Sequence, residues 1–343
     1  MSEKRALVSA VFLALLLAGV GHAATAPVPR TGATPVPAGS ARPVGSAVSV
    51  TRYDWVDPAR NRPVPVKIYS PASGGGPFPL IVFSHGLGGS RETYEYLGRY
   101  WAEHGYIAVH VQHPGSDEAV WRQNEHPVRS LRKAALDPRN AFARPLDVRF
   151  VLDRMTALNA EAGPFHGRID LRDVGMAGHS FGAWTTLALA GQKFPERLGQ
   201  VGDPRITAAV EMSAPIARFQ NPDVAYGAIR IPILHLTGTR DDLPFGHSPA
   251  ADRRVPFDHI RGADQYLVIF AGADHMAFAG LPFKRPAKAD NSLVQSLTQK
   301  STTAFWDAYL RHDAAARRWL SGGGFAAELG KAGRFELKSA PAR

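Results

Sequence analysis

The residues with the clearest chemical potential form the turn Gly178-His179-Ser180-Phe181-Gly182. An apolar run that predicts a buried strand precedes this turn, and a run of helix-forming residues, 183–190, follows it. A Gly-x-Ser-x-Gly turn between a strand and a helix is typical of a strained serine nucleophile, and its glycines let the two elements approach closely. We therefore predict that Ser180 attacks a carbonyl group; the alternative is a serine that only caps the helix.

A serine nucleophile requires a histidine base, and the base requires an acid that orients it. Asp241 and Asp242 follow the predicted strand 233–237, and His275 follows the last predicted strand, 266–270. We assign His275 as the general base because it follows the strand that would bring it to Ser180. Asp241 is assigned as the orienting acid, with its neighbour Asp242 left open as the competitor and a turn cap as its alternative role.

The developing oxyanion requires two hydrogen-bond donors. We predict the backbone N–H of Phe181, the residue after the nucleophile, as one of them. The other predicted donor is the backbone N–H of Leu87, in the His-Gly turn 84–89 that follows the third predicted strand. The alternative for this turn is an ordinary glycine-rich connection.

Histidines and glycine-rich segments could also form metal or cofactor sites. His110 and His113 are spaced so that they face opposite sides of a strand end, which makes shared metal ligation with Asp117 awkward. The sequence contains no His-Glu-x-x-His motif, no phosphate-binding loop with a lysine and no dinucleotide fingerprint. We therefore expect neither a metal nor a cofactor.

The order of the predicted elements indicates an α/β fold. After an early hairpin around 57–61, strands and helices alternate, which predicts a mostly parallel central sheet of about eight strands with helices on both faces. The expected strands are 48–55, 64–69, 80–84, 107–111, 174–176, 208–212, 233–237 and 266–270, and the expected helices are 93–104, 144–159, 183–190 and 293–311. One domain over residues 48–312 accounts for this pattern.

Three segments depart from the alternation. Residues 116–143 and 244–262 are predicted as long loops at the carboxyl edge of the sheet, where ligands bind in open α/β folds. Residues 313–343 are predicted as a C-terminal extension with a short helix and a frayed end.

The N-terminal residues are not expected to belong to the domain. Two basic residues, an apolar run and small residues give residues 1–23 the pattern of a secretory signal peptide, with an uncleaved anchor helix as the alternative. Residues 24–46 are rich in proline, alanine and glycine and predict a disordered linker. We expect export to the periplasm or the medium, and no membrane span after cleavage.

Composition narrows the functional classes. The chain of 343 residues is 45% hydrophobic, which suits a large folded domain. It contains no cysteine, so disulfides, thiol nucleophiles and thiolate metal sites are excluded. The net charge of +10 comes from scattered basic residues without a nucleic-acid-binding motif, so no nucleic-acid partner is expected.

The combined motifs resemble the α/β-hydrolase superfamily, and within it the dienelactone-hydrolase-like proteins related to platelet-activating factor acetylhydrolases. The resemblance covers residues 48–312 and rests on the segments 83–88, 178–189, 238–242 and 272–275. It implies Ser180, Asp241 and His275 as a catalytic triad, Leu87 and Phe181 as oxyanion donors, and no cofactor. Dienelactone hydrolases use a cysteine nucleophile, so a cysteine-free chain favours serine esterase chemistry.

We therefore expect an exported serine esterase that cleaves short acyl esters through an acyl-enzyme. Two alternatives remain at this point. The same fold could hydrolyse a polyester or another polymer, or transfer acyl groups, and a hydrolase scaffold could also serve as a non-catalytic binding protein. The sequence does not specify the oligomeric state.

Overall fold

The computed structural model describes residues 47–122, 124–217, 220–242, 248–279 and 291–341. The predicted signal peptide, 1–23, and the predicted linker, 24–46, lie outside these residues. No helix in the described ranges is long and apolar enough to cross a membrane.

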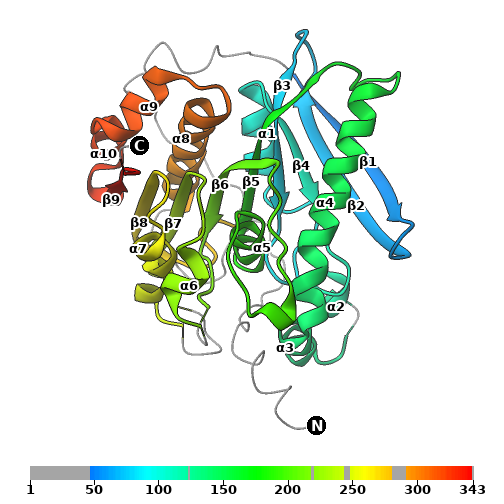
Figure 1. Cartoon of the computed structure of the whole chain (residues 1–343), viewed down its shortest axis with the longest axis horizontal. Helices are drawn as coiled ribbons and strands as arrows, with labels where there is room; N and C mark the ends of the chain where they lie inside the picture. The colour runs from blue at the N-terminus through cyan, green and yellow to red at the C-terminus, as the bar shows by residue number, and fades with distance from the viewer. Residues whose placement is uncertain (1–46, 123, 218–219, 243–247, 280–290, 342–343) are drawn as a thin grey trace, which may run out of the picture.

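A nine-stranded sheet forms the centre of the molecule (Figure 1). Its order is β1-β2-β4-β3-β5-β6-β7-β8-β9, and the six strands from β4 to β8 are mutually parallel. The strands are β1 Val48–Asp57, β2 Arg62–Pro71, β3 Phe78–Ser84, β4 Ile107–Val111, β5 Ile169–His179, β6 Ile206–Met212, β7 Ile233–Arg240, β8 Gln265–Asp274 and β9 Gly333–Lys338. The predicted α/β class, the early hairpin and all eight predicted strands are confirmed.

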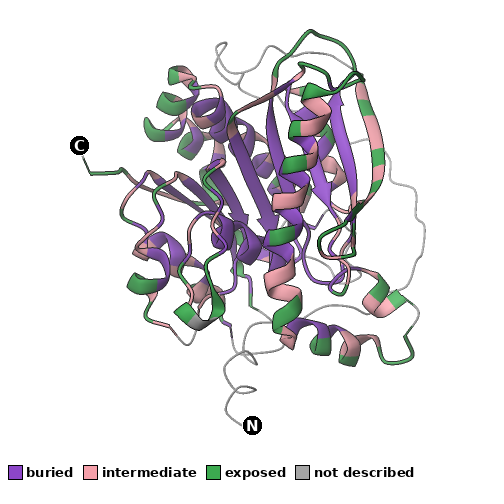
Figure 2. Ribbon diagram, turned by 45° about the vertical axis from the view of Figure 1, so that its right-hand side comes forward, coloured by how far each residue is buried: buried purple, intermediate pink, exposed green. Residues whose placement is uncertain are grey.

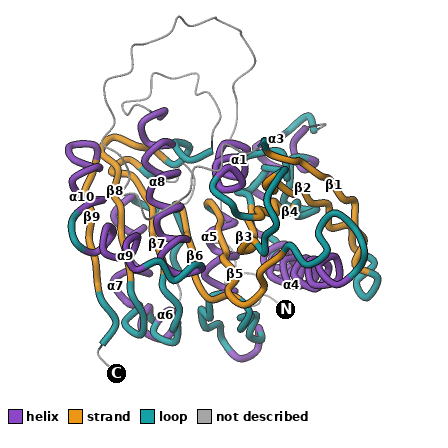
Figure 3. The backbone as a smooth tube through the Cα atoms, turned by 90° about the horizontal axis from the view of Figure 1, so that it is seen from above, coloured by secondary structure: helices purple, strands orange, loops and turns teal. Residues whose placement is uncertain are grey.

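Helices cover both faces of the sheet (Figure 3). On one face, α1 (Glu95–Glu103) and α8 (Asn291–Leu310) pack through Trp101 and Trp306. On the other face, α4 (Pro138–Ala160) and α5 (Phe181–Leu189) cover the apolar side chains of the parallel strands. The central strands are therefore buried on both sides, and α5 is buried throughout, whereas α4 keeps an exposed face (Figure 2).

The segment 116–143 is largely helical, which corrects the predicted long loop. It contains α2 (Ala119–Arg122), α3 (Pro127–Leu136) and the first turns of α4. The α4 helix begins earlier than predicted because the Asp137 side chain accepts a hydrogen bond from the Arg139 N–H and Pro138 occupies the first turn. Leu131 of α3 packs into an apolar cluster with Leu87 and Trp184.

The second predicted loop, 244–262, also contains helical structure in its described part. A 3-10 helix, Ala250–Arg254, is followed by the short helix α7, Val255–His259. A further short helix, α6 (Pro222–Tyr226), was not predicted. Residues 243–247 lie outside the described ranges.

The C-terminal segment corrects the prediction of a short helix with a frayed end. Helices α9 (Ala314–Ser321) and α10 (Gly324–Leu329) lead into β9, which pairs antiparallel with β8. Phe335 of β9 stacks on Tyr266 of β8, and Glu336 forms an ion pair with Arg254. The sheet therefore continues through Lys338, beyond the predicted domain end at 312.

Candidate active site

The nucleophile elbow lies where β5 ends and α5 begins. Ser180 has φ 56° and ψ −113°, a conformation that is unfavourable for a residue with a side chain. Its N–H donates to the Met212 carbonyl at 2.8 Å, and its carbonyl accepts from the Trp184 N–H at 3.1 Å. A Cβ atom at Gly182 would lie 1.8 Å from the Ser84 carbonyl oxygen, so the close approach of α5 to β3 requires glycine there.

Ser180, His275 and Asp241 form one continuous hydrogen-bonded array. The His275 Nε2 atom lies 2.9 Å from the Ser180 Oγ atom, and the His275 Nδ1 atom lies 2.7 Å from the Asp241 Oδ1 atom. All three residues are buried, with Ser180 6% exposed to solvent. This arrangement lets His275 take the serine proton while Asp241 fixes the orientation of the ring.

Asp241 is held as a carboxylate by neighbours on two sides. The Thr237 hydroxyl donates to its Oδ2 atom at 2.8 Å, and the guanidinium of the buried Arg253 lies 3.5 Å from its Oδ1 atom. Burial opposes ionisation, but the charges of His275 and Arg253 outweigh it and lower the Asp241 pKa to about 2. Sequence reasoning missed Arg253, which lies in the segment that was predicted as a loop.

Asp242 and the other histidines are placed away from this array. Asp242 accepts a hydrogen bond from the Ala250 N–H at 2.8 Å, a capping contact rather than a contact with His275. His235 lies between Glu211 and Gln265 inside the sheet, and His259 pairs with Asp223. His312 pairs with Asp173.

The two predicted oxyanion donors belong to neighbouring segments. Leu87 follows β3, Phe181 opens α5, and their side chains share one apolar cluster with Trp184. Their roles as backbone donors remain predictions.

The buried Arg144 of α4 connects these two segments. Its guanidinium donates to the His85 carbonyl at 2.7 Å and stacks on the Phe181 ring at 4.1 Å from the ring centroid. It also donates to the Ser116 hydroxyl at 3.0 Å. Burial lowers the Arg144 pKa to about 9, which leaves the side chain charged at neutral pH. Its position one helical turn before Val148, on the apolar face of α4, is a signal that could have identified it from the sequence.

A second buried network supports the same loop. The Ser84 hydroxyl lies 2.9 Å from the His113 Nε2 atom, and the His113 Nδ1 atom lies 3.0 Å from the Asp147 Oδ2 atom. Asp147 also binds Arg60 and Arg62. Burial lowers the His113 pKa to about 4, so the ring is neutral near pH 7. These residues resemble a triad in composition, but they are fully buried and hold β3 against α4.

His110, His113 and Asp117 do not converge on one point that a metal could occupy. The His110 Nδ1 atom lies 3.1 Å from the Thr93 carbonyl oxygen, whereas the His113 ring bridges Ser84 and Asp147. Asp117 accepts a hydrogen bond from Gln112. Among the described residues, no group of three or more histidine or carboxylate side chains is arranged to hold a metal ion.

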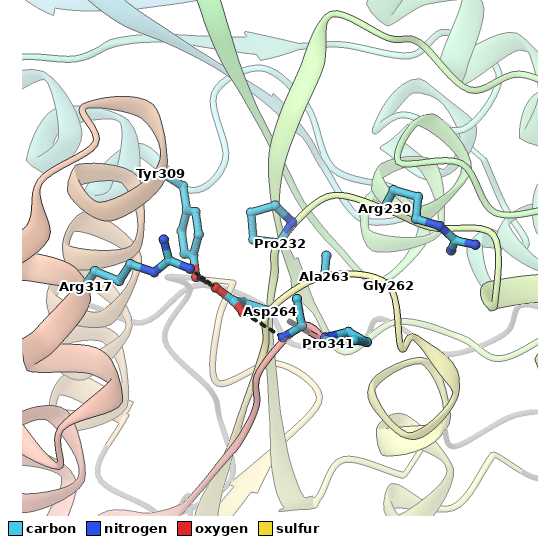
Figure 4. A pocket seen from close by; sticks show the side chains of 9 residues that line it. Arg230, Pro232, Gly262, Ala263, Asp264, Tyr309, Arg317 and Pro341 are labelled. Carbon is cyan, nitrogen blue, oxygen red and sulfur yellow. Dashed lines mark hydrogen bonds and ion pairs between the residues drawn. The ribbon is translucent and has the colours of Figure 1, made fainter. Parts of the chain in front are cut away.

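A surface hollow of about 490 Å³ lies beside the amino-terminal ends of β7 and β8, away from the carboxyl ends where the triad lies (Figure 4). Asp264, which precedes β8, lines it, and its carboxylate accepts hydrogen bonds from Tyr309, Arg317 and the Ala340 N–H. These bonds anchor the C-terminal segment. The hollow is therefore separate from the triad, which lies where the parallel strands end.

A strained serine after a central parallel strand, with its acid and base after two later strands, defines the chain as a protein of the α/β-hydrolase fold. The family model "Platelet-activating factor acetylhydrolase, isoform II" matches residues 59–130. The predicted resemblance to platelet-activating factor acetylhydrolases is confirmed.

Two curated proteins are similar to a larger part of the chain. The chain is 24% identical to the platelet-activating factor acetylhydrolase of Cavia porcellus over 297 residues, a match that covers 75% of this chain and 63% of the relative. The enzyme of Bos taurus is 25% identical, with 69% of this chain and 58% of the relative covered. The chain therefore spans about three fifths of the length of these relatives.

Proposed function

We propose that the chain is a serine esterase that hydrolyses short acyl esters through an acyl-enzyme. The observation that carries this proposal is the array Ser180–His275–Asp241, with hydrogen-bond distances of 2.9 and 2.7 Å. The relatives carry the name acetylhydrolase, which specifies a small acyl group and supports the short-chain part of the proposal.

The proposed reaction has two stages. Ser180 Oγ attacks the ester carbonyl while His275 Nε2 accepts the serine proton, and the tetrahedral oxyanion receives hydrogen bonds from the Leu87 and Phe181 N–H groups. His275 then returns the proton to the leaving alcohol as the carbon–oxygen bond breaks. Water attacks the acyl-enzyme with His275 as base, and release of the acid restores Ser180. Asp241 stabilises the imidazolium at both stages.

A series of p-nitrophenyl esters tests this proposal. We expect kcat/KM to be highest for acetate and to fall as the acyl chain lengthens, and we expect Ser180→Ala to abolish turnover. A preference for long chains would contradict the short-chain assignment, and activity that persists in Ser180→Ala would contradict the nucleophile. Turnover of an insoluble polyester film in preference to soluble esters would favour a polymer hydrolase instead.

We also infer that the protein is exported, because residues 1–23 have the charge and hydrophobicity pattern of a signal peptide. Expression of the full chain, followed by N-terminal sequencing of the periplasmic and secreted fractions, should give a mature start near Ala23 or Ala24. An intact N-terminus in the cytoplasmic fraction would contradict export.

A further inference from the structure

Tyr94 and His179 lie behind the triad and make contacts that the reaction scheme does not use. Tyr94 precedes α1 and is 6% exposed, and His179 is the residue before the nucleophile and is 1% exposed. The Tyr94 hydroxyl lies 2.7 Å from the His179 Nδ1 atom. The His179 Nε2 atom lies 2.8 Å from the His275 carbonyl oxygen.

The direction of these hydrogen bonds follows from their partners. A carbonyl oxygen only accepts, so the His179 Nε2 atom carries the proton and donates to His275. The Nδ1 atom then lacks a proton and accepts from the Tyr94 hydroxyl. Burial lowers the His179 pKa to about 3, so the ring is neutral near pH 7.

The hydrogen bonds from Tyr94 through His179 to His275 are called the bridge below. The bridge also contacts the loop with the predicted oxyanion donor. The backbone of Gly86 lies beside the Tyr94 hydroxyl. A Cβ atom at Gly86 would lie 3.2 Å from the His179 Nδ1 atom and 3.3 Å from the Tyr94 oxygen, so this loop packs directly on the pair. Gly86 is adjacent to Leu87, whose N–H is the predicted donor.

We propose that Tyr94 and His179 are positioning residues that fix three loops relative to one another: the nucleophile elbow, the loop with His275 and the loop with Leu87. This proposal rests on the proposed esterase function. Tyr94 has φ 61°, a conformation that is uncommon for an aromatic residue and that the fold holds in place. Its ring packs against Phe83 at a centroid distance of 4.7 Å, which fixes the hydroxyl between Gly86 and His179.

Tyr94→Phe tests the bridge with little change in side-chain volume. Small displacements of reacting groups lower rates by about 10- to 100-fold, so we expect kcat for p-nitrophenyl acetate to fall by that factor with KM nearly unchanged. Tyr106→Phe is the matched control. The buried Tyr106 hydroxyl donates to Asp307 at 2.6 Å beside the amino-terminal end of β4, away from the triad. The control should keep the wild-type kcat.

His179→Gln and His179→Leu provide the second arm. Glutamine can still donate to the His275 carbonyl and should keep most of the kcat, whereas leucine cannot and should lose as much as Tyr94→Phe. The double variant Tyr94→Phe/His179→Leu should lose no more than the worse single variant, because both changes break one bridge.

Two results would overturn the bridge. One is a wild-type kcat in folded Tyr94→Phe. If Tyr94→Phe does not fold, a wild-type kcat in folded His179→Leu has the same meaning. The other is an equal kcat loss in His179→Gln and His179→Leu. Failure of the esterase proposal is distinguishable, because wild-type protein would then be inactive or Ser180→Ala would remain active.

Discussion

Arg144 offers a perturbation whose effects on stability and on catalysis differ. Arg144→Met keeps the apolar length of the side chain but removes the contacts to the His85 carbonyl and the Ser116 hydroxyl. Hydrogen bonds to a charged group contribute about 1.5–3 kcal/mol each, so loss of these two destabilises the fold by about 3–6 kcal/mol. Burial acts in the opposite direction, because it lowers the Arg144 pKa and imposes a desolvation cost on the guanidinium that methionine avoids. We therefore expect a net destabilisation below this figure and a variant that folds.

Catalysis has no such compensation. Arg144 links the loop of Leu87 to the ring of Phe181, and deletion of one oxyanion donor lowers kcat by about 10²–10³-fold. Displacement of a donor is milder than its deletion, so we expect kcat to fall by about 10–100-fold with little change in KM. Initial rates on p-nitrophenyl acetate measure this loss, and urea unfolding measures the stability.

Arg149→Met is the matched control on the same helix, because Arg149 contacts Gly202 and Asp203 rather than the site. It should keep the wild-type kcat. A folded Arg144→Met variant with kcat within about twofold of wild type would refute the role of Arg144, as would an equal loss in the control.

Three further predictions concern the acid, the elbow and the buried histidines. Asp241→Asn should lower kcat by about 10⁴-fold, whereas Asp242→Asn should keep nearly wild-type rates in steady-state assays; the reverse order would contradict the assignment. Gly182→Ala should fail to give folded protein, judged by soluble yield and circular dichroism, because its Cβ would lie 1.8 Å from the Ser84 carbonyl oxygen. Acid should destabilise the fold, because burial lowers the histidine pKa values in the folded state only. The stability that depends on neutral buried histidines is therefore present above about pH 6.5 and is lost as pH falls. Three buried histidines have folded pKa values near 3–4: His110, His113 and His179. Each should lower the free energy of unfolding by about 2 kcal/mol between pH 7 and pH 5. An unchanged urea midpoint between these pH values would contradict the prediction.

The parallel strands were predictable because burial on both faces produces apolar runs that stand out in the sequence. The elbow was predictable for a related reason, since close packing at Gly178 and Gly182 admits no larger residue. The order of Ser180, Asp241 and His275 along the chain then placed each of them after a strand.

Other parts depended on tertiary contacts that the local sequence does not reveal. The strand β9 is short, and it forms by pairing with β8 and by the packing of Phe335 on Tyr266. The sequence of helix α3 resembles a polar loop because one face of the helix is exposed and basic. Its apolar residues stabilise the helix by packing against Leu87 and Trp184. Tyr94 lies 85 residues before His179, so their contact could not be inferred from spacing.

The central claim is that Ser180 becomes covalently acylated within its hydrogen-bonded triad. Incubation of the purified protein with a fluorophosphonate probe, followed by peptide mass mapping, measures the nucleophilic reactivity that this acylation requires, because the Ser180 oxygen displaces fluoride at phosphorus. We predict one equivalent of label on Ser180 in wild-type protein and none in Ser180→Ala. An unlabelled Ser180 in folded wild-type protein, or label on another residue, would contradict the account.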